Sequence, residues 1–544
     1  MDFRRHIPRR LWRSNSNQSL NPNQYKIQAG PPAKRSQASL RRTPLRREDS
    51  RRLRQRITKQ SNEQYTNKNY GEALQKSLLF YEANRSGDLD ENRNHFTWRS
   101  DSGLSDGHDG VYFGDYDPSN LQSNLDLDLT GGYYDAGDSI KFGLPLAFTL
   151  TTLSWGGQQF QDGYKSIGQF DNLIETIRWG TDYLLKAHVV NPDGSTRFFI
   201  AQVGDPIMDH NQWLPPERQA TPRPALAVTP EKPGSDVAAQ SAAALASASI
   251  LFRLNNETTY ADLLLNNAKS LFAFADGFRG RYTDSIPSTK SSYNSWNGYY
   301  DDLCFGAAWL ARASAAAGQD SAIYRQKSID IYTNNIGRLA NDGAYSWDNC
   351  SYGTAILLAK DCNLDAYQSD IEHWLDSWIN GTNGVQKTRA GLRYIKPWGS
   401  LRYAANTAFM AAVYADETGD PTGIYQSLVQ ETIDYITGEN PLHRSYIVGY
   451  GANYPERPHH RGASGLAPTE YASKAPNKHV IYGALVGGPT SPNDFDYRDT
   501  RTDYIGNEVA LDYNSGLSGA LAYIVQKLGG QALGEQQLAK LPGI

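Results

Sequence analysis

Residues 235–254 read SDVAAQSAAALASASILFRL, a run of twenty residues that is rich in alanine and contains neither glycine nor proline. Alanine has the highest intrinsic helix propensity, so this run predicts a helix that begins just after Gly234. Comparable patterns recur along the chain, and many of them also follow Gly, Ser or Asp. They cover residues 144–155, 171–188, 259–275, 301–317, 321–334, 351–360, 367–380, 401–417, 422–437 and 514–528.

With a further helix in NYGEALQKSLLFYEANRSG near the start, the sequence predicts an all-α fold of about twelve helices. Strand-like alternation is scarce, and short candidates include residues 445–451 and 479–485. About twelve helices without a short repeat favour an α/α barrel of six helical hairpins over a bundle or a superhelix. Residues 94–143 are predicted to form long active-site loops, because they are dense in Gly, Asp and aromatic residues.

The net charge of −4 conceals two very different regions. Residues 1–60 contain 17 Lys/Arg and 3 Asp/Glu, whereas the rest of the chain contains 37 and 55. The acidic body argues against nucleic-acid binding. No eighteen-residue apolar run occurs, so no membrane span is predicted.

The sequence divides into three parts. Residues 1–65 are predicted to be a disordered, Arg-rich segment, 66–532 a catalytic domain and 533–544 a short tail. The Arg-rich segment is open to interpretation as a polyanion-binding arm, as a propeptide with dibasic cleavage sites or as an incorrectly assigned start. It shows no apolar region typical of a secretory signal. Cys350 and Cys362 are candidates for one disulfide.

Two acidic clusters are the strongest chemical signal. The first is YRDTRTDYIGNEVALDYNS, residues 497–515, and the second is GGYYDAGDSIKFG, residues 131–143. Hydrolysis of a glycosidic bond needs one carboxyl group as acid and another as base, and the two clusters can supply one each. Aromatic rings beside the acids offer stacking surfaces for sugars. Considered alone, the first cluster is equally consistent with a polar loop whose acids are solvated or cap a helix, and the second favours a turn whose Asp side chains bind backbone amides. The acids of the first cluster are Asp499, Asp503, Glu508 and Asp512, and those of the second are Asp135 and Asp138.

From about residue 66 to residue 530 the chain resembles glycoside hydrolase family 9, whose best-known members are endo-β-1,4-glucanases. The motifs that carry the resemblance occur in a fixed order along the chain. They are DLTGGYYDAGDSIKFGLPLAFT, VGDPIMDHNQW with PPE, PGSDVAAQSAAALA, YNSWNGYYDDL, YSWDNCSYGTAILLAK, WGSLRYAANTAFMA, GENPLHRSYIVGYG with RPHHRGA, and YRDTRTDYIGNEVALDYNSG.

The resemblance implies roles for the acids. Asp138 matches the base that takes a proton from the attacking water, and Asp135 matches the carboxylate that holds this water. Glu508 matches the general acid. Asp499 matches another acidic position of the family's catalytic signature, for which we expect support of the acid's loop. Family members of this kind invert the anomeric centre, so the acid and base are expected about 6.5–9.5 Å apart.

Other positions match the family's substrate cleft. His459 and Arg461 match a catalytic-site His-x-Arg that contacts sugar hydroxyls; a solvated loop or a metal site are the alternatives for this His-His-Arg run. Aromatic and polar contacts to the glucan are implied for His210, Trp213, Tyr293, Trp296, Trp347, Trp398 and Tyr513.

Asp301 and Asp302 match a region where some relatives hold calcium. Asp302 stands where relatives often have Glu, and Ser139 follows the base where they often have His. Because hard oxygen ligands suit calcium, this ion is a candidate structural ion. No cofactor is expected to be required for the reaction.

We therefore predict an inverting endo-β-1,4-glucanase that acts on cellulose or related β-glucans as a monomer, without a nucleic-acid or membrane partner. The resemblance implies secretion. The alternatives are an exo-acting glucosidase or glucosaminidase of the same family, or a non-catalytic glucan-binding protein.

Overall fold

The computed structural model describes residues 68–89, 94–122, 124–362 and 365–544. Lys68–Ile544 form one compact unit. The predicted Arg-rich segment 1–65 lies outside the described residues.

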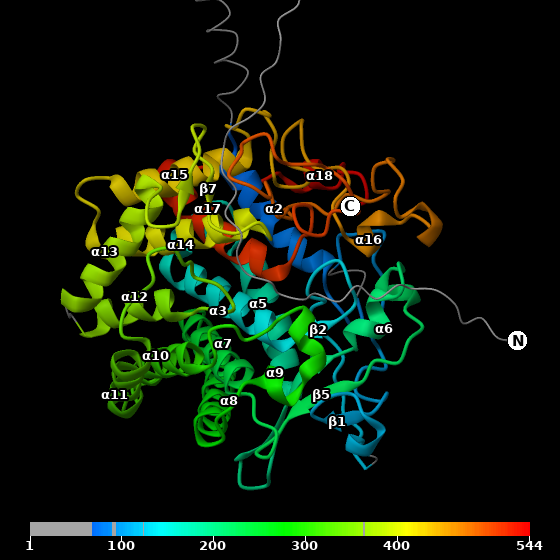
Figure 1. The fold of residues 1–544 in the computed structure, drawn as a ribbon, viewed down its shortest axis with the longest axis vertical. Coiled ribbons are helices and arrows are strands. Elements are labelled where there is room, and N and C mark those ends of the chain that lie inside the picture. The colour runs from blue at the N-terminus through cyan, green and yellow to red at the C-terminus, as the bar shows by residue number, and fades with distance from the viewer. Residues whose placement is uncertain (1–67, 90–93, 123, 363–364) are drawn as a thin grey trace, which may run out of the picture. The chain divides into compact units, whose positions relative to one another are not determined.

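Six helices form a closed inner ring, in which each helix packs against the next and the last packs against the first. A second helix layer surrounds this ring, and each outer helix packs on one or two inner ones (Figure 1). The inner helices are α3 (Gly143–Gln159), α7 (Ser235–Leu254), α10 (Tyr300–Ala316), α12 (Ser351–Cys362), α14 (Ser400–Thr418) and α17 (Leu511–Leu528). The outer helices are α2 (Tyr70–Ala83), α5 (Phe170–Ala187), α8 (Thr258–Gly277), α11 (Ala322–Ile331), α13 (Asp365–Asn380) and α15 (Ile424–Thr437). This arrangement is the predicted six-hairpin α/α barrel.

The sequence of α7 explains its place in the inner ring. Nearly all of its residues are buried, because Ala and Ser on every side let neighbouring helices approach closely. It is long and apolar enough to span a membrane by composition, but 89% of the tested window is buried inside the barrel. At another inner contact, a Cβ on Gly516 of α17 would lie 2.1 Å from Asn406 Oδ1 of α14. Outer helix α5 instead buries one face, with Leu173, Ile177 and Leu184 inside.

A small sheet stands beside the barrel, in the order β1-β5-β4-β2, with β3 also paired to β4. The β1–β5 pair is parallel and the other pairs are antiparallel. A separate hairpin joins β6 and β7. The strands are β1 (Val111–Phe113), β2 (Lys141–Phe142), β3 (His188–Val190), β4 (Thr196–Val203), β5 (Ala225–Val228), β6 (Gln386–Lys387) and β7 (Arg393–Tyr394). Short helices are α4 (Gln161–Ser166), α6 (Pro206–His210), α9 (Tyr282–Ser285), α16 (Arg461–Ser464) and α18 (Glu535–Leu538).

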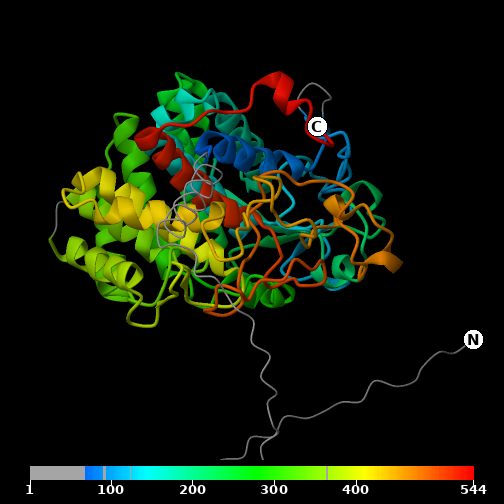
Figure 2. The same ribbon diagram turned by 90° about the horizontal axis from the view of Figure 1, so that it is seen from above.

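Long loops gather on one side of the barrel. Figures 1 and 2 both show the blue loops before α3, the teal loops before α7 and the orange loops between α15 and α17 on the same side. The prediction of a loop-rich segment at 94–143 is confirmed, since its described residues contain only β1, a 3₁₀ turn at Pro118–Asn120, β2 and the first residue of α3.

Both strand predictions were wrong. Residues 445–451 and 479–485 are extended only locally and share one isolated bridge, between Ile447 and Leu485. Gly449, Gly451 and Gly483 adopt positive φ, which interrupts any ladder there. The sequence analysis also missed β4, whose residues are buried almost throughout, so that it lacks the alternation typical of a half-exposed strand.

The C-terminal residues pack on the same compact unit. Gln75 of α2 exchanges two hydrogen bonds with the backbone of Leu533, and Thr97 N donates to Gly543 O (3.0 Å). The candidate disulfide is also wrong. Cys350 is a free, buried cysteine, and α12 separates it from Cys362. A helix of that length spans about 16 Å, well beyond the reach of a disulfide.

Candidate active site

Three chain segments meet at the base of the loop region and are joined through backbone groups. Arg461 N donates to Gly137 O (3.0 Å), and His459 N donates to Asn507 O (2.7 Å). Leu511 N donates to Asp135 O (2.9 Å). The two acidic clusters of the sequence, some 370 residues apart, are therefore held side by side.

Gly137 permits this close approach. A Cβ there would lie 2.5 Å from His459 O and 2.6 Å from the Cα of His460, and both are backbone atoms that cannot swing away. The Gly137→Ala variant is therefore expected to push the segments apart. Because a displacement of about 1 Å can cost about 10²-fold in turnover, kcat should fall by about that factor. The matched control is Gly277→Ala, since nothing lies within 4 Å of its added Cβ. Unchanged kcat in Gly137→Ala would contradict the need for this contact.

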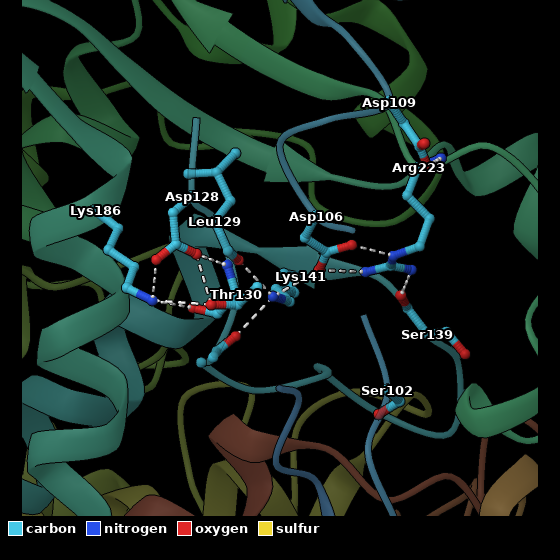
Figure 3. Close-up of polar contacts among 12 residues, drawn as sticks. Ser102, Asp106, Asp109, Asp128, Leu129, Thr130, Ser139, Lys141, Lys186 and Arg223 are labelled. Carbon is cyan, nitrogen blue, oxygen red and sulfur yellow. Dashed lines mark hydrogen bonds and ion pairs between the residues drawn. The ribbon is translucent and has the colours of Figure 1, made fainter. Parts of the chain in front are cut away.

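A buried charge network supports the loop that carries Asp138 (Figure 3). Lys141 Nζ contacts Asp106 Oδ2 (2.6 Å) and donates to the carbonyls of Leu129 (2.9 Å) and Gly131 (2.6 Å). Arg223 binds both oxygens of Asp106 and also donates to Ser139 O. Both ends of the loop are thus tied to one buried carboxylate.

Asp138 is surrounded by groups that favour its ionised form. Its Oδ2 lies 3.1 Å from His210 Nε2, and Ile140 N donates to Oδ1 (3.4 Å). Burial alone would raise its pKa, but the hydrogen bond from His210 and the charges of His210 and Arg461 outweigh burial and lower it. Arg461 is itself fixed by an ion pair with Asp209 (2.6 Å). A partly accessible carboxylate that stays ionised suits a general base.

Asp135 has the opposite electrostatics. Burial, followed by the charges of Asp138 and Asp512, raises its pKa well above the usual value. Tyr293 Oη donates to Asp135 Oδ2. The other oxygen, Oδ1, is buried and has no hydrogen-bond partner among the described residues, so an ordered water molecule is the partner it would need.

Glu508 is positioned by two donors that contact the same oxygen. Trp398 Nε1 lies 2.8 Å and Tyr513 Oη 3.2 Å from Oε2. Burial and the charge of Asp138 raise the pKa of Glu508 to about 7, against the lowering effects of Trp398, Arg402 and Tyr513. Glu508 can therefore keep a proton near neutral pH, and Oε1 is left to carry it.

His459 faces the same region as a neutral side chain. Its Nδ1 donates to Arg501 O (2.7 Å), which fixes the tautomer and leaves Nε2 as an acceptor. Burial lowers its pKa to about 4. By contrast, Asp499 binds the backbone N–H groups of Glu456 (2.8 Å) and Arg457 (2.9 Å). Asp499 thus fixes the loop that leads to His459.

The predicted aromatic residues differ in exposure. Trp296 is 73% and Trp398 43% exposed, so both offer open faces. Trp213 lies edge-on to His459, with ring centroids 5.1 Å apart. Trp347 is buried and packs against Tyr293 (4.9 Å). The structure therefore offers two of the four tryptophans as open platforms and packs the other two against site residues.

Comparisons with known proteins identify the family of this chain. The model of glycosyl hydrolase family 9 matches residues 70–521. The chain belongs to this family. It is 42% identical over 474 residues to endoglucanase B of Cellulomonas fimi, covering 86% of this chain and 43% of that protein.

Solved structures give the same result. The endoglucanase of the termite Nasutitermes takasagoensis has a TM-score of 0.75 at 41% identity and covers 85% of this chain and all of its own. Endoglucanase CelQ of Clostridium thermocellum, solved with cellobiose and cellotriose, has a TM-score of 0.72 at 35% identity and covers 86% of this chain and 72% of its own. The family 9 fold therefore extends over nearly all of Lys68–Ile544.

A third acidic cluster of this family 9 chain lies at the start of α10. Ligand atoms of Asp301, Asp302 and Cys350 lie within 4.8 Å of one another. Burial raises the pKa of Asp301 to about 6, and burial with the charge of Asp301 raises that of Asp348 to about 7. Burial and the charge of Asp301 also raise the pKa of Asp302 well above its usual value. Among the described residues, no Lys, Arg or His forms an ion pair with these carboxylates. Carboxylate oxygens without a cationic partner are the donor set expected for a hard cation.

Sequence reasoning missed three residues of the family 9 site: Asp209, Arg402 and Asp512. Asp209 directly precedes the predicted His210, but its ion pair with Arg461 spans 252 residues. Asp512 was recognised only as one of the acids of the first cluster, without a catalytic role. Such partners become visible only when the segments meet in space.

Proposed function

We propose that this protein is an inverting endo-β-1,4-glucanase that hydrolyses internal bonds of cellulose or related β-glucans. The observation that carries the proposal is the joining of Asp138 and Glu508 through backbone contacts, with the pKa of one lowered and that of the other raised. An ionised base and a protonated acid at the same pH are what a single-displacement hydrolysis requires.

In the proposed reaction Asp138 accepts a proton from water, and the water oxygen forms a bond to the anomeric carbon. Glu508 gives its proton to the glycosidic oxygen as the bond to the leaving sugar breaks. Asp135 orients the water through Oδ1, while His210, His459 and Arg461 contact sugar hydroxyls. Each turnover leaves Asp138 protonated and Glu508 ionised, and proton exchange with solvent restores both. No metal or cofactor takes part in these steps.

The exposed tryptophan rings support cleavage at internal bonds of the glucan chain. Trp296 and Trp398 give flat apolar surfaces on which a glucan can lie. All of the groups assigned above come from one chain, so we infer a monomer, and the family resemblance supports secretion.

Loss of viscosity tests the endo mode. Soluble carboxymethyl-cellulose should lose most of its viscosity while few reducing ends have formed, because internal cuts shorten long chains quickly. Viscosity and reducing ends should be measured on the same samples, with Glu508→Gln as the inactive control. Reducing sugar that accumulates without early viscosity loss would indicate an exo-acting enzyme. Glucan binding without hydrolysis would indicate a non-catalytic protein.

We also propose calcium at Asp301, Asp302 and Asp348. The ion would neutralise these carboxylates and tie α10 to the loop of Asp348, which accepts hydrogen bonds from Trp296 N (2.8 Å) and Asn297 N (3.3 Å). Its role would be to stabilise the strip of cleft that carries Trp296.

Calcium should raise the melting temperature of chelator-treated protein by a few degrees. A ligand at 100 times its Kd stabilises the folded state by about 2.7 kcal/mol. Asp302→Asn should lose this response, whereas the exposed control Asp320→Asn should keep it. Zinc serves as a comparison because of the Cys350 thiol. An unchanged melting temperature at millimolar calcium would contradict the site.

A further inference from the structure

Arg402 and Asp512 form a buried ion pair directly behind Glu508. Arg402 lies in α14 and Asp512 in the first turn of α17, two inner helices that pack together. Arg402 Nη1 lies 3.1 Å from Asp512 Oδ2. Asp512 is fully buried and Arg402 is 6% exposed. The mechanism proposed above uses neither residue.

Arg402 contacts both groups that hold Glu508. Its guanidinium carbon lies 4.8 Å from the centroid of the Tyr513 ring. Its Nη2 donates to Trp398 O (3.3 Å) and to Tyr403 Oη (2.8 Å). Since Trp398 and Tyr513 both donate to Oε2 of Glu508, one side chain braces the two donors that fix the acid.

Asp512 balances the charge of Arg402. Its carboxylate lies in the first turn of α17, where the helix dipole favours an anion. Its Oδ1 and the Nε of Arg402 have no hydrogen-bond partner in the described part of the chain. The charges of Arg402 and Asp512 therefore compensate each other mainly through the ion pair. Glu508 consequently experiences a smaller electric field than either charge alone would produce.

We propose that the Arg402–Asp512 pair positions Glu508 and sets the upper pH limit at which this acid still holds its proton. The inference rests on the role of Glu508 proposed above and goes beyond it, because it assigns the control of that acid to two residues outside the reacting groups. Arg402 and Asp512 are positioning residues.

Other groups also act on Glu508. Asp138 and Asp135 face it from the loop before α3, and Tyr293 stands beside Asp135. His459 lies on the neighbouring segment and is neutral, and the Tyr513 phenol beside Arg402 has a pKa raised by burial. Arg402 is the cation among the largest influences on Glu508, and Lys396 lies farther out, over the Tyr403 ring, so the removal of Arg402 has a definite sign.

The two halves of the pair should shift the pH profile in opposite directions. Arg402→Gln removes a positive charge, so the ionised form of Glu508 is less favoured and the acid keeps its proton to higher pH. Asp512→Asn leaves the charge of Arg402 unbalanced, so Glu508 loses its proton at lower pH. An opposite charge at short range shifts a carboxyl pKa by about 1–3 units, and a partly balanced one should give about 0.5–1 unit.

The test is the pH dependence of kcat/KM on cellopentaose. The alkaline limb is the fall of kcat/KM at high pH. It should move to higher pH in Arg402→Gln, to lower pH in Asp512→Asn, and return near the wild-type pH in the double variant. Arg402→Lys keeps the charge but loses the planar stack and the fork of donors. Its alkaline limb should therefore stay in place while kcat falls several-fold.

Thermal melting identifies variants that do not fold. If Arg402→Gln or Asp512→Asn does not fold, the neutral double variant and Arg402→Lys still test the inference. Shifts in the same direction, or no shift in any folded variant, would overturn the inference. A change confined to KM would instead identify Arg402 as a substrate contact and would also overturn it. If Glu508→Gln retains full activity, the proposed function fails. If Glu508→Gln is inactive and the limbs do not move, only this inference fails.

Discussion

Glu508→Gln is expected to lower kcat on cello-oligosaccharides by about 10²–10⁴-fold. Glutamine keeps the size of the side chain and can still accept hydrogen bonds from Trp398 and Tyr513, but it has no acidic proton for the leaving sugar. In the wild-type enzyme, activity should fall as pH rises through about 7, because the pKa of Glu508 is raised to about 7 and the ionised form cannot donate. That alkaline limb should disappear in Glu508→Gln.

An activated substrate separates this role from a structural one. A dinitrophenyl cellobioside has a leaving group that needs little protonation, so its hydrolysis by Glu508→Gln should fall far less than that of cellopentaose. The control is Glu456→Gln, an exposed change on a loop near His459. Equal losses on both substrates would contradict the assignment of Glu508 as the general acid.

Asp138→Asn is expected to lower turnover by a similar factor, about 10²–10⁴-fold, on both substrates. The base acts on the attacking water, so a better leaving group cannot replace it. Substrate binding should persist, because Arg461, His459 and the exposed tryptophans remain. The KM and kcat values for cellopentaose and the dinitrophenyl cellobioside provide the measurement.

Azide offers a direct check on Asp138. It attacks carbon without losing a proton, so it should restore part of the activity of Asp138→Asn and yield a glycosyl azide of inverted configuration. The exposed change Asp126→Asn should leave turnover unchanged. Wild-type turnover in Asp138→Asn would exclude Asp138 as the base.

The helices were predictable because their signal is local. Alanine-rich runs and the spacing of apolar residues determine α7 and its neighbours without reference to the rest of the chain. β4 was missed because a strand that is buried on both faces shows no alternation. The 445–451 and 479–485 segments showed a suitable composition, but glycines at positive φ limit them to one bridge.

The roles of Glu508 as acid and Asp138 as base stay predictions, and they came from the order of long motifs. Their supports were not predictable, because Arg402, Asp512 and Asp209 act through partners that lie far away in sequence. The different hydrogen bonds of Asp135 and Asp138 likewise come from Tyr293 and His210, which lie on two other segments of the chain. The expected separation of acid and base stays a prediction.

The backbone hydrogen bonds that join the segments of Gly137, His459 and Leu511 have a consequence for the evolution of this enzyme. A peptide N–H is present whatever side chain is chosen, except in proline. These backbone bonds therefore do not depend on most of the side chains around them, with Gly137 as the exception because an added Cβ would meet His459 O. Exposed positions of segment 205–233 other than Asp209, His210, Trp213 and Arg223 can therefore change to suit new polysaccharides while the chemistry at the centre is inherited unchanged.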